Sequence, residues 1–231
     1  DLLDGAVKYS NEKIDHYLET KKQNSITKIY LQSCISRNEF FKDDPLISLA
    51  LSDWIISKAS SYLNMIPIVG SIQVWYSPNE NKIEEGSQFF HLDYADVNQC
   101  KVFINLDKID EDSGPLTFVP KEKSEKITKS INYKLSNKDI RISDDVVLKH
   151  SDKKEWIKST GEKGDILMVD SSRCIHFGSR AASKPRRILM IQYITPFSFT
   201  LPLNYRGKTF LSPVFEKSLK TSDKHSLIIG I

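Results

Sequence analysis

The sequence predicts a mainly β protein, a barrel or jelly roll packed against helices from its N-terminal part. Three observations carry this prediction: a helical pattern confined to residues 1–65, a series of short β-rich segments after it, and Gly-, Pro-, Asp- and Asn-rich turns between them. The 231 residues, 39% of them hydrophobic, suffice for a sizeable core without disulfides. We therefore expect one domain over residues 1–231, with a β core at 66–196 and a C-terminal extension at 197–231.

The helical part carries one clear amphipathic pattern. Asp44 can cap a helix whose first turn begins with Pro45, and apolar residues then recur three or four positions apart as far as Leu63. We expect a single helix that ends near Asn64. Residues 10–22 are a weaker helix candidate.

From residue 66 the apolar pattern changes to that of strands. A lysine-rich insertion at about 121–154 interrupts it, where we expect a short helix and a loop. This insertion mixes acidic with basic residues and has few aromatic ones, so a solvated lid or surface loop is favoured over a nucleic-acid surface. The tail after residue 196 is expected to be irregular and to cover the core. The expected strands span residues 68–76, 88–93, 101–106, 116–119, 156–159, 165–169 and 186–195.

Composition indicates which compartment and which classes of partner to expect. The net charge of +3 does not indicate a nucleic-acid partner. Cys34, Cys100 and Cys174 are far apart and form no CxxC motif, which favours a reducing compartment. No apolar run reaches the length of a membrane span, and the first residues lack the apolar region of a signal peptide. We expect a cytoplasmic protein without membrane or nucleic-acid partners, and the oligomeric state stays open.

His91 and Asp93 stand two residues apart in the segment FFHLDYAD. On a strand, residues at this spacing share one face. An imidazole and a carboxylate are two of the three ligands in the facial triad of non-haem Fe(II) oxygenases, although an H-x-D pair alone is weak evidence. Among the other four histidines, only His176 adjoins an expected core strand. The three residues together predict a metal site.

Arg186 and Arg187 begin the last expected strand, about ten residues after His176. A facial triad leaves three iron positions open, and in one large class of oxygenases 2-oxoglutarate fills two of them. Its remote carboxylate then needs a fixed cation, which arginine provides through paired hydrogen bonds. Because neighbours on a strand face opposite ways, one of the two arginines can point inward. The alternative is a surface pair at a strand end.

Two longer stretches carry a combined pattern. They are FFHLDYADVNQCKVFINLDKIDEDSGPLTFVP at residues 89–120 and GDILMVDSSRCIHFGSRAASKPRRILMIQY at residues 164–193. The succession of H-x-D, E-D-S-G-P, V-P, G-D, H-x-G-S and a strand-leading arginine resembles the phytanoyl-CoA dioxygenase (PhyH-like) family of Fe(II)- and 2-oxoglutarate-dependent oxygenases. The similarity covers about residues 66–196. It implies a double-stranded β-helix, a cupin-like jelly roll, with iron at one mouth.

The resemblance also implies roles for single residues. His91, Asp93 and His176 match the metal ligands, and Arg186 matches the arginine that binds the 5-carboxylate of 2-oxoglutarate. Spacing to Tyr193 favours Arg186, whereas spacing from His176 favours Arg187. The small polar residue near the cosubstrate corresponds to Ser179, one place later than usual because Phe177 stands where the family has glycine. By analogy alone, three more residues face the pocket: Gln73, Lys101 and Asn105. Of these, Gln73 and Asn105 could hydrogen-bond the cosubstrate.

The implied activity is that of a dioxygenase that uses Fe(II), molecular oxygen and 2-oxoglutarate on a small-molecule substrate and releases succinate and CO₂. Related halogenases lack the carboxylate that Asp93 provides, so we expect a hydroxylase or another enzyme that oxidises C–H bonds. A non-catalytic jelly-roll ligand-binding protein is the main alternative. A metal hydrolase would need zinc and a general base, and the G-x-S-x-G elbow of serine hydrolases is absent. The substrate stays open.

Overall fold

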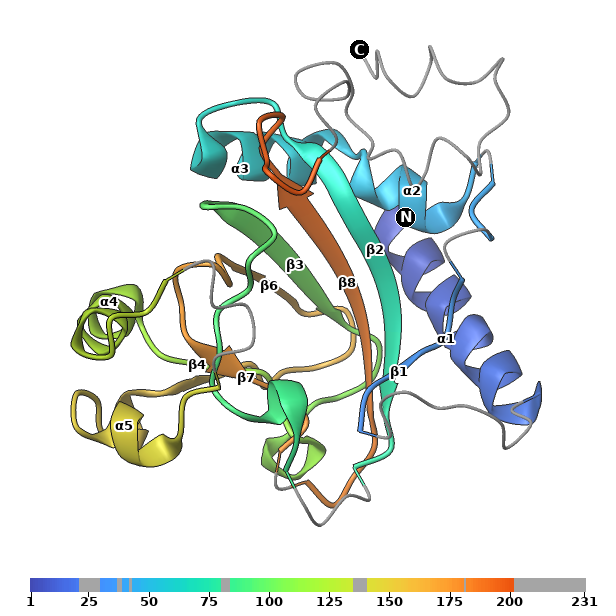
Figure 1. The fold of residues 1–231 in the computed structure, drawn as a ribbon. Helices are drawn as coiled ribbons and strands as arrows, with labels where there is room; N and C mark the ends of the chain where they lie inside the picture. The colour runs from blue at the N-terminus through green and yellow to red at the C-terminus, as the bar shows by residue number, and fades with distance from the viewer. Residues whose placement is uncertain are drawn as a thin grey trace.

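Two antiparallel sheets form the centre of the molecule, and helices pack on the larger one (Figure 1). The structure, a computed structural model, describes residues 1–20, 30–36, 39–41, 43–79, 84–134, 141–180 and 182–201. The predicted fold class, a jelly-roll-like β core packed on N-terminal helices, is confirmed. The two sheets form an open sandwich and do not close into a barrel.

The larger sheet has the strand order β1-β2-β8-β3-β6. Its central strand, β8 (Arg186–Ile194), pairs with β2 (Ile68–Ser77) on one side and with β3 (Gln99–Asn105) on the other. The edges are β1 (Gln32–Ser33) and β6 (Ile166–Val169). The smaller sheet has the order β5-β4-β7, with bounds Ile157–Lys158, Thr117–Phe118 and His176–Phe177.

Side chains of the larger sheet alternate between two environments, as the period of a strand requires. On one face, apolar residues join the N-terminal helices in the main core; they include Ile72, Val74, Val102, Leu189 and Ile191. The opposite face of the same strands looks toward the smaller sheet. Phe103, Ile188 and Met190 pack there with Phe118 of β4. This second face lines a cavity between the two sheets.

Three helices cover the outer face of the larger sheet: α1 (Leu2–Thr20), α2 (Pro45–Ala50) and α3 (Asp53–Leu63). Asp44 caps α2 as predicted, because its carboxylate accepts a 2.8 Å hydrogen bond from the Leu46 N–H. The prediction of a single helix from Pro45 to Asn64 is wrong. Ser52 has an extended backbone and starts α3 as its N-cap, while its hydroxyl donates to the Leu49 carbonyl at 2.6 Å. The left-handed residue Asn64 ends α3, as predicted.

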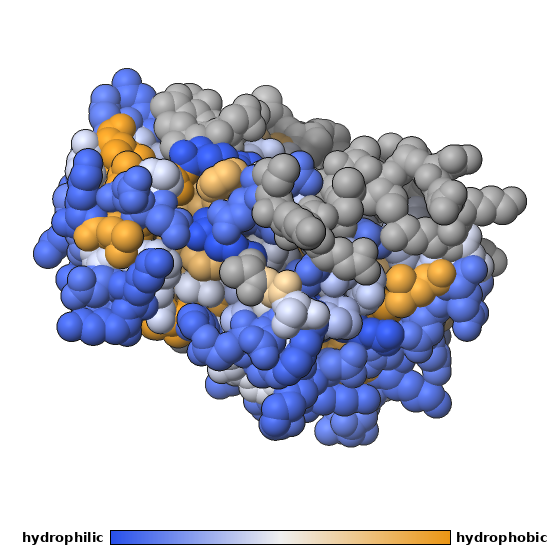
Figure 2. All heavy atoms as spheres, turned by 90° about the horizontal axis from the view of Figure 1, so that it is seen from below, coloured by the Kyte–Doolittle hydropathy of each residue, from blue (hydrophilic) through white to orange (hydrophobic). Residues whose placement is uncertain are grey.

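The insertion folds into two helices, α4 (Lys121–Ser130) and α5 (Asp144–Leu148). Short 3₁₀ turns lie at Gly86–Gln88 (η1), Glu111–Ser113 (η2) and Lys153–Glu155 (η3). Part of the loop expected within the insertion lies outside the described residues. The tail after Leu201 lies entirely outside them. Within the described part, no helix is both long and apolar enough to cross a membrane. The face seen in Figure 2 is mostly hydrophilic, with apolar side chains in small separate areas.

Candidate metal centre and its cavity

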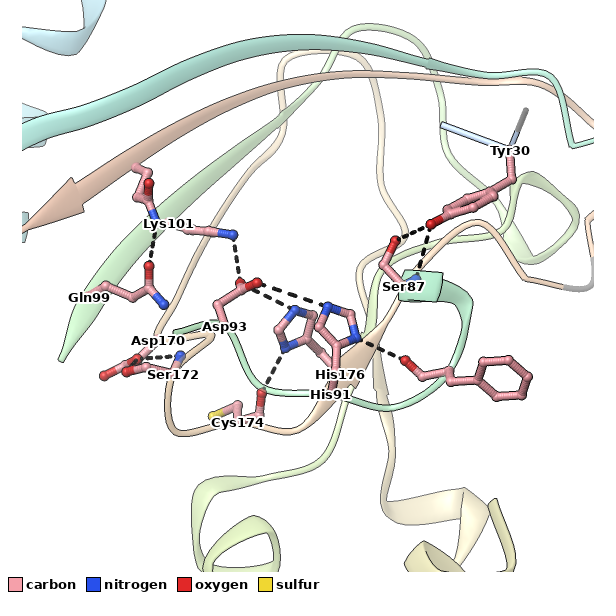
Figure 3. Close-up of polar contacts among 12 residues, drawn as sticks. Tyr30, Ser87, His91, Asp93, Gln99, Lys101, Asp170, Ser172, Cys174 and His176 are labelled. Atoms are coloured by element: carbon pink, nitrogen blue, oxygen red, sulfur yellow. Dashed lines mark hydrogen bonds and ion pairs between the residues drawn. The ribbon is translucent and has the colours of Figure 1, made fainter. Parts of the chain in front are cut away.

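His91 and His176 face each other across an isolated pair of antiparallel segments. Each backbone N–H donates to the other residue's carbonyl at 3.0 Å, and the ring centroids lie 4.4 Å apart. The prediction of a strand over residues 88–93 is wrong, because only Phe90 and His91 make bridges there. Asp93 is fixed instead by its N–H, which donates to the Ser171 carbonyl at 2.9 Å. The three side chains nevertheless converge (Figure 3).

Both histidine rings are oriented by backbone carbonyls. Nδ1 of His91 donates to the Phe89 carbonyl, and Nδ1 of His176 donates to the Cys174 carbonyl, each at 2.9 Å. Since a carbonyl only accepts, both rings carry a proton on Nδ1, and Nε2 is the nitrogen that each ring turns toward Asp93. Burial, followed by the neighbouring His176, lowers the pKa of His91 to about 3, which keeps that ring neutral near pH 7. Metal-ligating histidines have this arrangement.

Asp93 lies against both rings and against Lys101. Its Oδ2 is 3.4 Å from Nε2 of His176, and its Oδ1 is 4.0 Å from Nε2 of His91. The Lys101 ammonium donates to Oδ2 at 2.6 Å. Burial alone would raise the pKa of Asp93, but Lys101 and the two histidines together hold it well below its usual range. The Asp93 carboxylate is therefore anionic at every physiological pH.

Ligand atoms from His91, Asp93 and His176 all lie within 4.8 Å of one another. Two imidazole nitrogens and one carboxylate oxygen are the donor set that suits Fe(II) and similar divalent ions. The three side chains line one wall of a cavity of about 540 Å³ between the two sheets. The described residues therefore fit a single divalent metal ion with room beside it for further ligands.

Arg186 lies in the same cavity, at the start of β8. Nη1 donates to the Gly114 carbonyl at 2.8 Å, and Nη2 donates to the Ser179 hydroxyl at 2.7 Å. Among the described residues Arg186 has no ion pair, and its buried Nε has no hydrogen-bond partner. Burial lowers the pKa of Arg186 to about 10, which still leaves it charged. A buried cation held only by neutral groups can accommodate an anion.

Arg187 points the other way, toward α1. Its guanidinium contacts Asp15 at 2.8 Å and Asp107 at 3.5 Å, and it donates to the Asn11 side chain at 3.1 Å. Because successive side chains of a strand point to opposite faces, Arg186 points into the cavity and Arg187 points toward the helices. Only the first lies within reach of a ligand in the cavity.

Gly114 and Ser179 shape the pocket around Arg186. Gly114 has a left-handed backbone (φ +61°), and a Cβ there would lie 3.1 Å from Cα of Ser179. Ser179 is also left-handed (φ +58°), its N–H donates to the Gly114 carbonyl at 3.1 Å, and its hydroxyl contacts that of Ser77 at 2.8 Å. Only glycine permits both this backbone and this close approach at residue 114. The E-D-S-G-P segment thereby brings a carbonyl onto the guanidinium.

Two of the three residues expected in the cavity by analogy line it. Lys101 does so through its contact with Asp93, and Gln73 lies on the wall with its Oε1 accepting from the Ser33 hydroxyl at 3.0 Å. Asn105 is buried but is not among the lining residues, and its side-chain nitrogen lies near Gly161. Asn105 ends β3, and its role as a cosubstrate partner stays a prediction.

Two arginines that sequence reasoning did not single out help to build the site. Arg180 stacks 3.8 Å over the Phe177 ring and pairs with Glu84 at 3.2 Å and Asp144 at 2.7 Å, so it ties the η1 segment and α5 to the strand of His176. Arg141 lines the cavity next to Ile142, whose N–H donates to the Phe90 carbonyl at 2.8 Å. Neither residue lies in a strand or carries a motif, so no local pattern marked it.

No family model matches the chain, and no curated protein matches it by sequence. Solved structures are similar in fold. The non-haem α-ketoglutarate-dependent epimerase SnoN from nogalamycin biosynthesis has a TM-score of 0.55 at 14% identity, over 83% of this chain and 74% of that one. AviO1 from Streptomyces viridochromogenes Tue57 has a TM-score of 0.54 at 15% identity, over 87% and 88%. HygX from Streptomyces hygroscopicus, crystallised with nickel and 2-oxoglutarate, has a TM-score of 0.53 at 10% identity, over 90% and 87%.

Proposed function

We propose that the protein is an Fe(II)- and 2-oxoglutarate-dependent oxygenase that acts on a small molecule. His91, Asp93 and His176 hold the metal, and Arg186 binds the remote carboxylate of 2-oxoglutarate. The observation that carries the proposal is the pairing of these two features in one cavity: three converging metal ligands and a buried arginine without a carboxylate partner among the described residues. A metal hydrolase would have no use for that arginine.

The walls of the cavity agree with this assignment. Near Arg186 they are formed mainly by apolar side chains, including Ile109, Leu116 and Ile188, which suit the two methylene groups of 2-oxoglutarate. Ser179 and Gly114 hold the guanidinium still, so that little side-chain entropy is lost when a carboxylate binds. The likeness in fold to SnoN and to HygX with bound 2-oxoglutarate supports the same class.

When bound, the metal would activate molecular oxygen, the oxidant of the reaction, which takes two electrons from 2-oxoglutarate as it becomes succinate and CO₂ and two from the substrate. The residues of this chain bind and orient. Backbone carbonyls fix both histidine rings, and Lys101 fixes the Asp93 carboxylate. No side chain of the cavity is required to act as a general base, so the lack of a catalytic dyad there is consistent with the reaction class.

The finer assignment is hydroxylation by a member of the PhyH-like family. Two features of this chain support it: the succession of motifs over residues 89–120 and 164–193, and the carboxylate of Asp93, which occupies the position that a halogenase leaves open. The carboxylate completes the ligand set, which supports oxygen transfer to the substrate carbon over halogenation.

An anaerobic titration tests the proposal. Protein with Fe(II) should develop a visible charge-transfer band when 2-oxoglutarate is added, because the cosubstrate binds the metal directly. Asp93→Ala should lose the band together with metal binding, whereas Asp96→Ala, a nearby aspartate that accepts from Thr195, should keep it. A folded wild-type protein that binds Fe(II) and 2-oxoglutarate with no band would overturn the assignment.

A further inference from the structure

The turn from Asp170 to Cys174 contacts two of the three residues of the candidate metal centre through its backbone. The Ser171 carbonyl accepts from the Asp93 N–H at 2.9 Å, and the Cys174 carbonyl accepts from Nδ1 of His176 at 2.9 Å (Figure 3). Both acceptors are backbone groups, so the shape of the turn sets where they point. One short piece of chain therefore fixes the backbone of Asp93 and the ring of His176.

The Asp170 carboxylate holds the turn in this shape. Its Oδ1 accepts from the Ser172 N–H at 2.9 Å and from the Ser172 hydroxyl at 2.5 Å, the local bonding that aspartate makes in turns. The Asp170 carbonyl also accepts from the Cys174 N–H at 2.9 Å. The Ser172 hydroxyl lies 3.1 Å from the Val97 carbonyl, so the turn rests against the chain that follows Asp93.

Tyr62 of α3 holds the other oxygen of this carboxylate. Its hydroxyl donates to Oδ2 of Asp170 at 2.6 Å. Among the described residues, Tyr62 is the one side-chain partner of Asp170 from outside the turn. Asp170 itself directly follows β6, an edge strand of the larger sheet. The carboxylate thus links a helix of the outer layer to the turn that contacts the metal centre.

We propose that Tyr62 and Asp170 are positioning residues for the metal centre, because they hold the turn at 170–174 in the shape that aims Asp93 and His176 at one metal ion. This inference rests on the proposed function, which assigns a metal to these ligands. Neither Tyr62 nor Asp170 is among the described residues that line the cavity, so both act through the turn. Groups that orient the ligands of a metal commonly change its affinity when they are removed.

The affinity for Mn(II), measured by calorimetry on the metal-free protein, tests the proposal. Tyr62→Phe removes only the hydroxyl and should raise the Kd by about threefold, and Asp170→Ala should raise it by about tenfold. Asp170→Asn keeps an acceptor for Ser172 and should recover part of the affinity. Adding Tyr62→Phe to Asp170→Ala should cause no further loss, because the two side chains act as one unit.

Two matched variants separate positioning from a general loss of stability. Tyr193→Phe removes a hydroxyl that donates to the Ala50 carbonyl at 2.7 Å, and Asp44→Ala removes a buried carboxylate that accepts from the N–H two residues further on. Both should lower the free energy of unfolding in urea and leave the Kd for Mn(II) unchanged. An unchanged Kd in Tyr62→Phe would overturn the proposal, and so would a rise in the two controls equal to that in Tyr62→Phe.

Failure of the proposed function would be seen separately, as a wild-type protein that binds no Mn(II). The turn is then tested in the metal-free protein by deuterium exchange of backbone amides. The Asp93 N–H should exchange about threefold faster, relative to the amides of β8, in Tyr62→Phe but not in Tyr193→Phe. This result would still support the positioning of Asp93 by the turn. A wild-type ratio in Tyr62→Phe would reject it.

Discussion

The Lys101 ammonium donates a 2.6 Å hydrogen bond to Oδ2 of Asp93, one of the three converging residues of the candidate metal centre (Figure 3). Lys101 is nearly buried, in a strand whose neighbouring side chains are all buried. A lysine so placed requires a partner, and Asp93 provides it. The ammonium holds the carboxylate in place, but it also competes with a metal ion for the lone pairs of the same carboxylate.

Lys101→Met should tighten metal binding. A divalent ion on Asp93 is repelled by the ammonium on the same carboxylate, and methionine keeps the bulk of the side chain without the charge. We expect the Kd for Mn(II) to fall by about tenfold, which corresponds to about 1.4 kcal/mol. Calorimetry on the metal-free protein measures it. Lys108→Met, which removes a surface pair with Glu162, should leave the Kd unchanged. Weaker Mn(II) binding would mean that holding the carboxylate outweighs the repulsion.

Arg186→Gln should weaken 2-oxoglutarate binding by on the order of 30-fold or more, because it removes a desolvated charge that pairs with the remote carboxylate. Arg187→Gln should leave that affinity unchanged, since Arg187 contacts Asp15 and Asp107 on the helical side. Both constants are measured by calorimetry with Mn(II) in place of Fe(II). Equal losses in the two variants would contradict the inward assignment of Arg186.

The sequence predicted the sheet core well because strand signals are local. The apolar pattern of β2, β3 and β8 located these strands to within two residues at each end. The sequence also named the three converging residues, since histidines are few and H-x-D is a recognisable spacing. It placed Asp93 on a strand, however, whereas a hydrogen bond to Ser171, 78 residues away along the chain, fixes it.

The remaining features depend on contacts between distant segments. The helix break at Ser52 arises from one hydroxyl–carbonyl bond, and no apolar period marks it. Arg180 pairs with Asp144, and Ile142, the neighbour of Arg141, bridges to Phe90; only the folded chain brings these residues close. The Lys101–Asp93 pair had a usable signal, a lysine within the buried strand QCKVFIN, but its partner could not be read from spacing.

Gly114→Ala should impair both stability and cosubstrate binding. Its left-handed backbone disfavours a side chain by about 1–2 kcal/mol, and the new Cβ would meet Cα of Ser179 at 3.1 Å. Gly164→Ala is the matched control, because Gly164 is also left-handed (φ +88°) but has open space around it. Urea unfolding should show a larger loss for Gly114→Ala. The Kd for 2-oxoglutarate should rise only in Gly114→Ala. A rise in both variants would show that the loss of cosubstrate binding is not specific to Gly114.

The pH dependence of the metal-free protein should report His91. Burial and His176 lower the pKa of its folded-state ring to about 3, while the unfolded ring titrates near 6.5. Below pH 6.5 the unfolded chain therefore takes up a proton that the folded chain does not, and stability falls as the pH drops toward 3. For one proton, the free energy of unfolding falls by at most about 1.4 kcal/mol per pH unit.

Urea unfolding at pH 6.5, 5.5 and 4.5 measures this slope in wild type and in His91→Gln. The variant cannot take up the proton, so its free energy of unfolding should fall less steeply over this range, by up to about 1.4 kcal/mol per unit. The depressed pKa of Asp93 acts below the usual carboxyl range and so contributes little in this window. His16→Gln, on the exposed side of α1, is the histidine control and should keep the wild-type slope. Parallel slopes for wild type and His91→Gln would show that the folded ring accepts a proton as readily as the unfolded one.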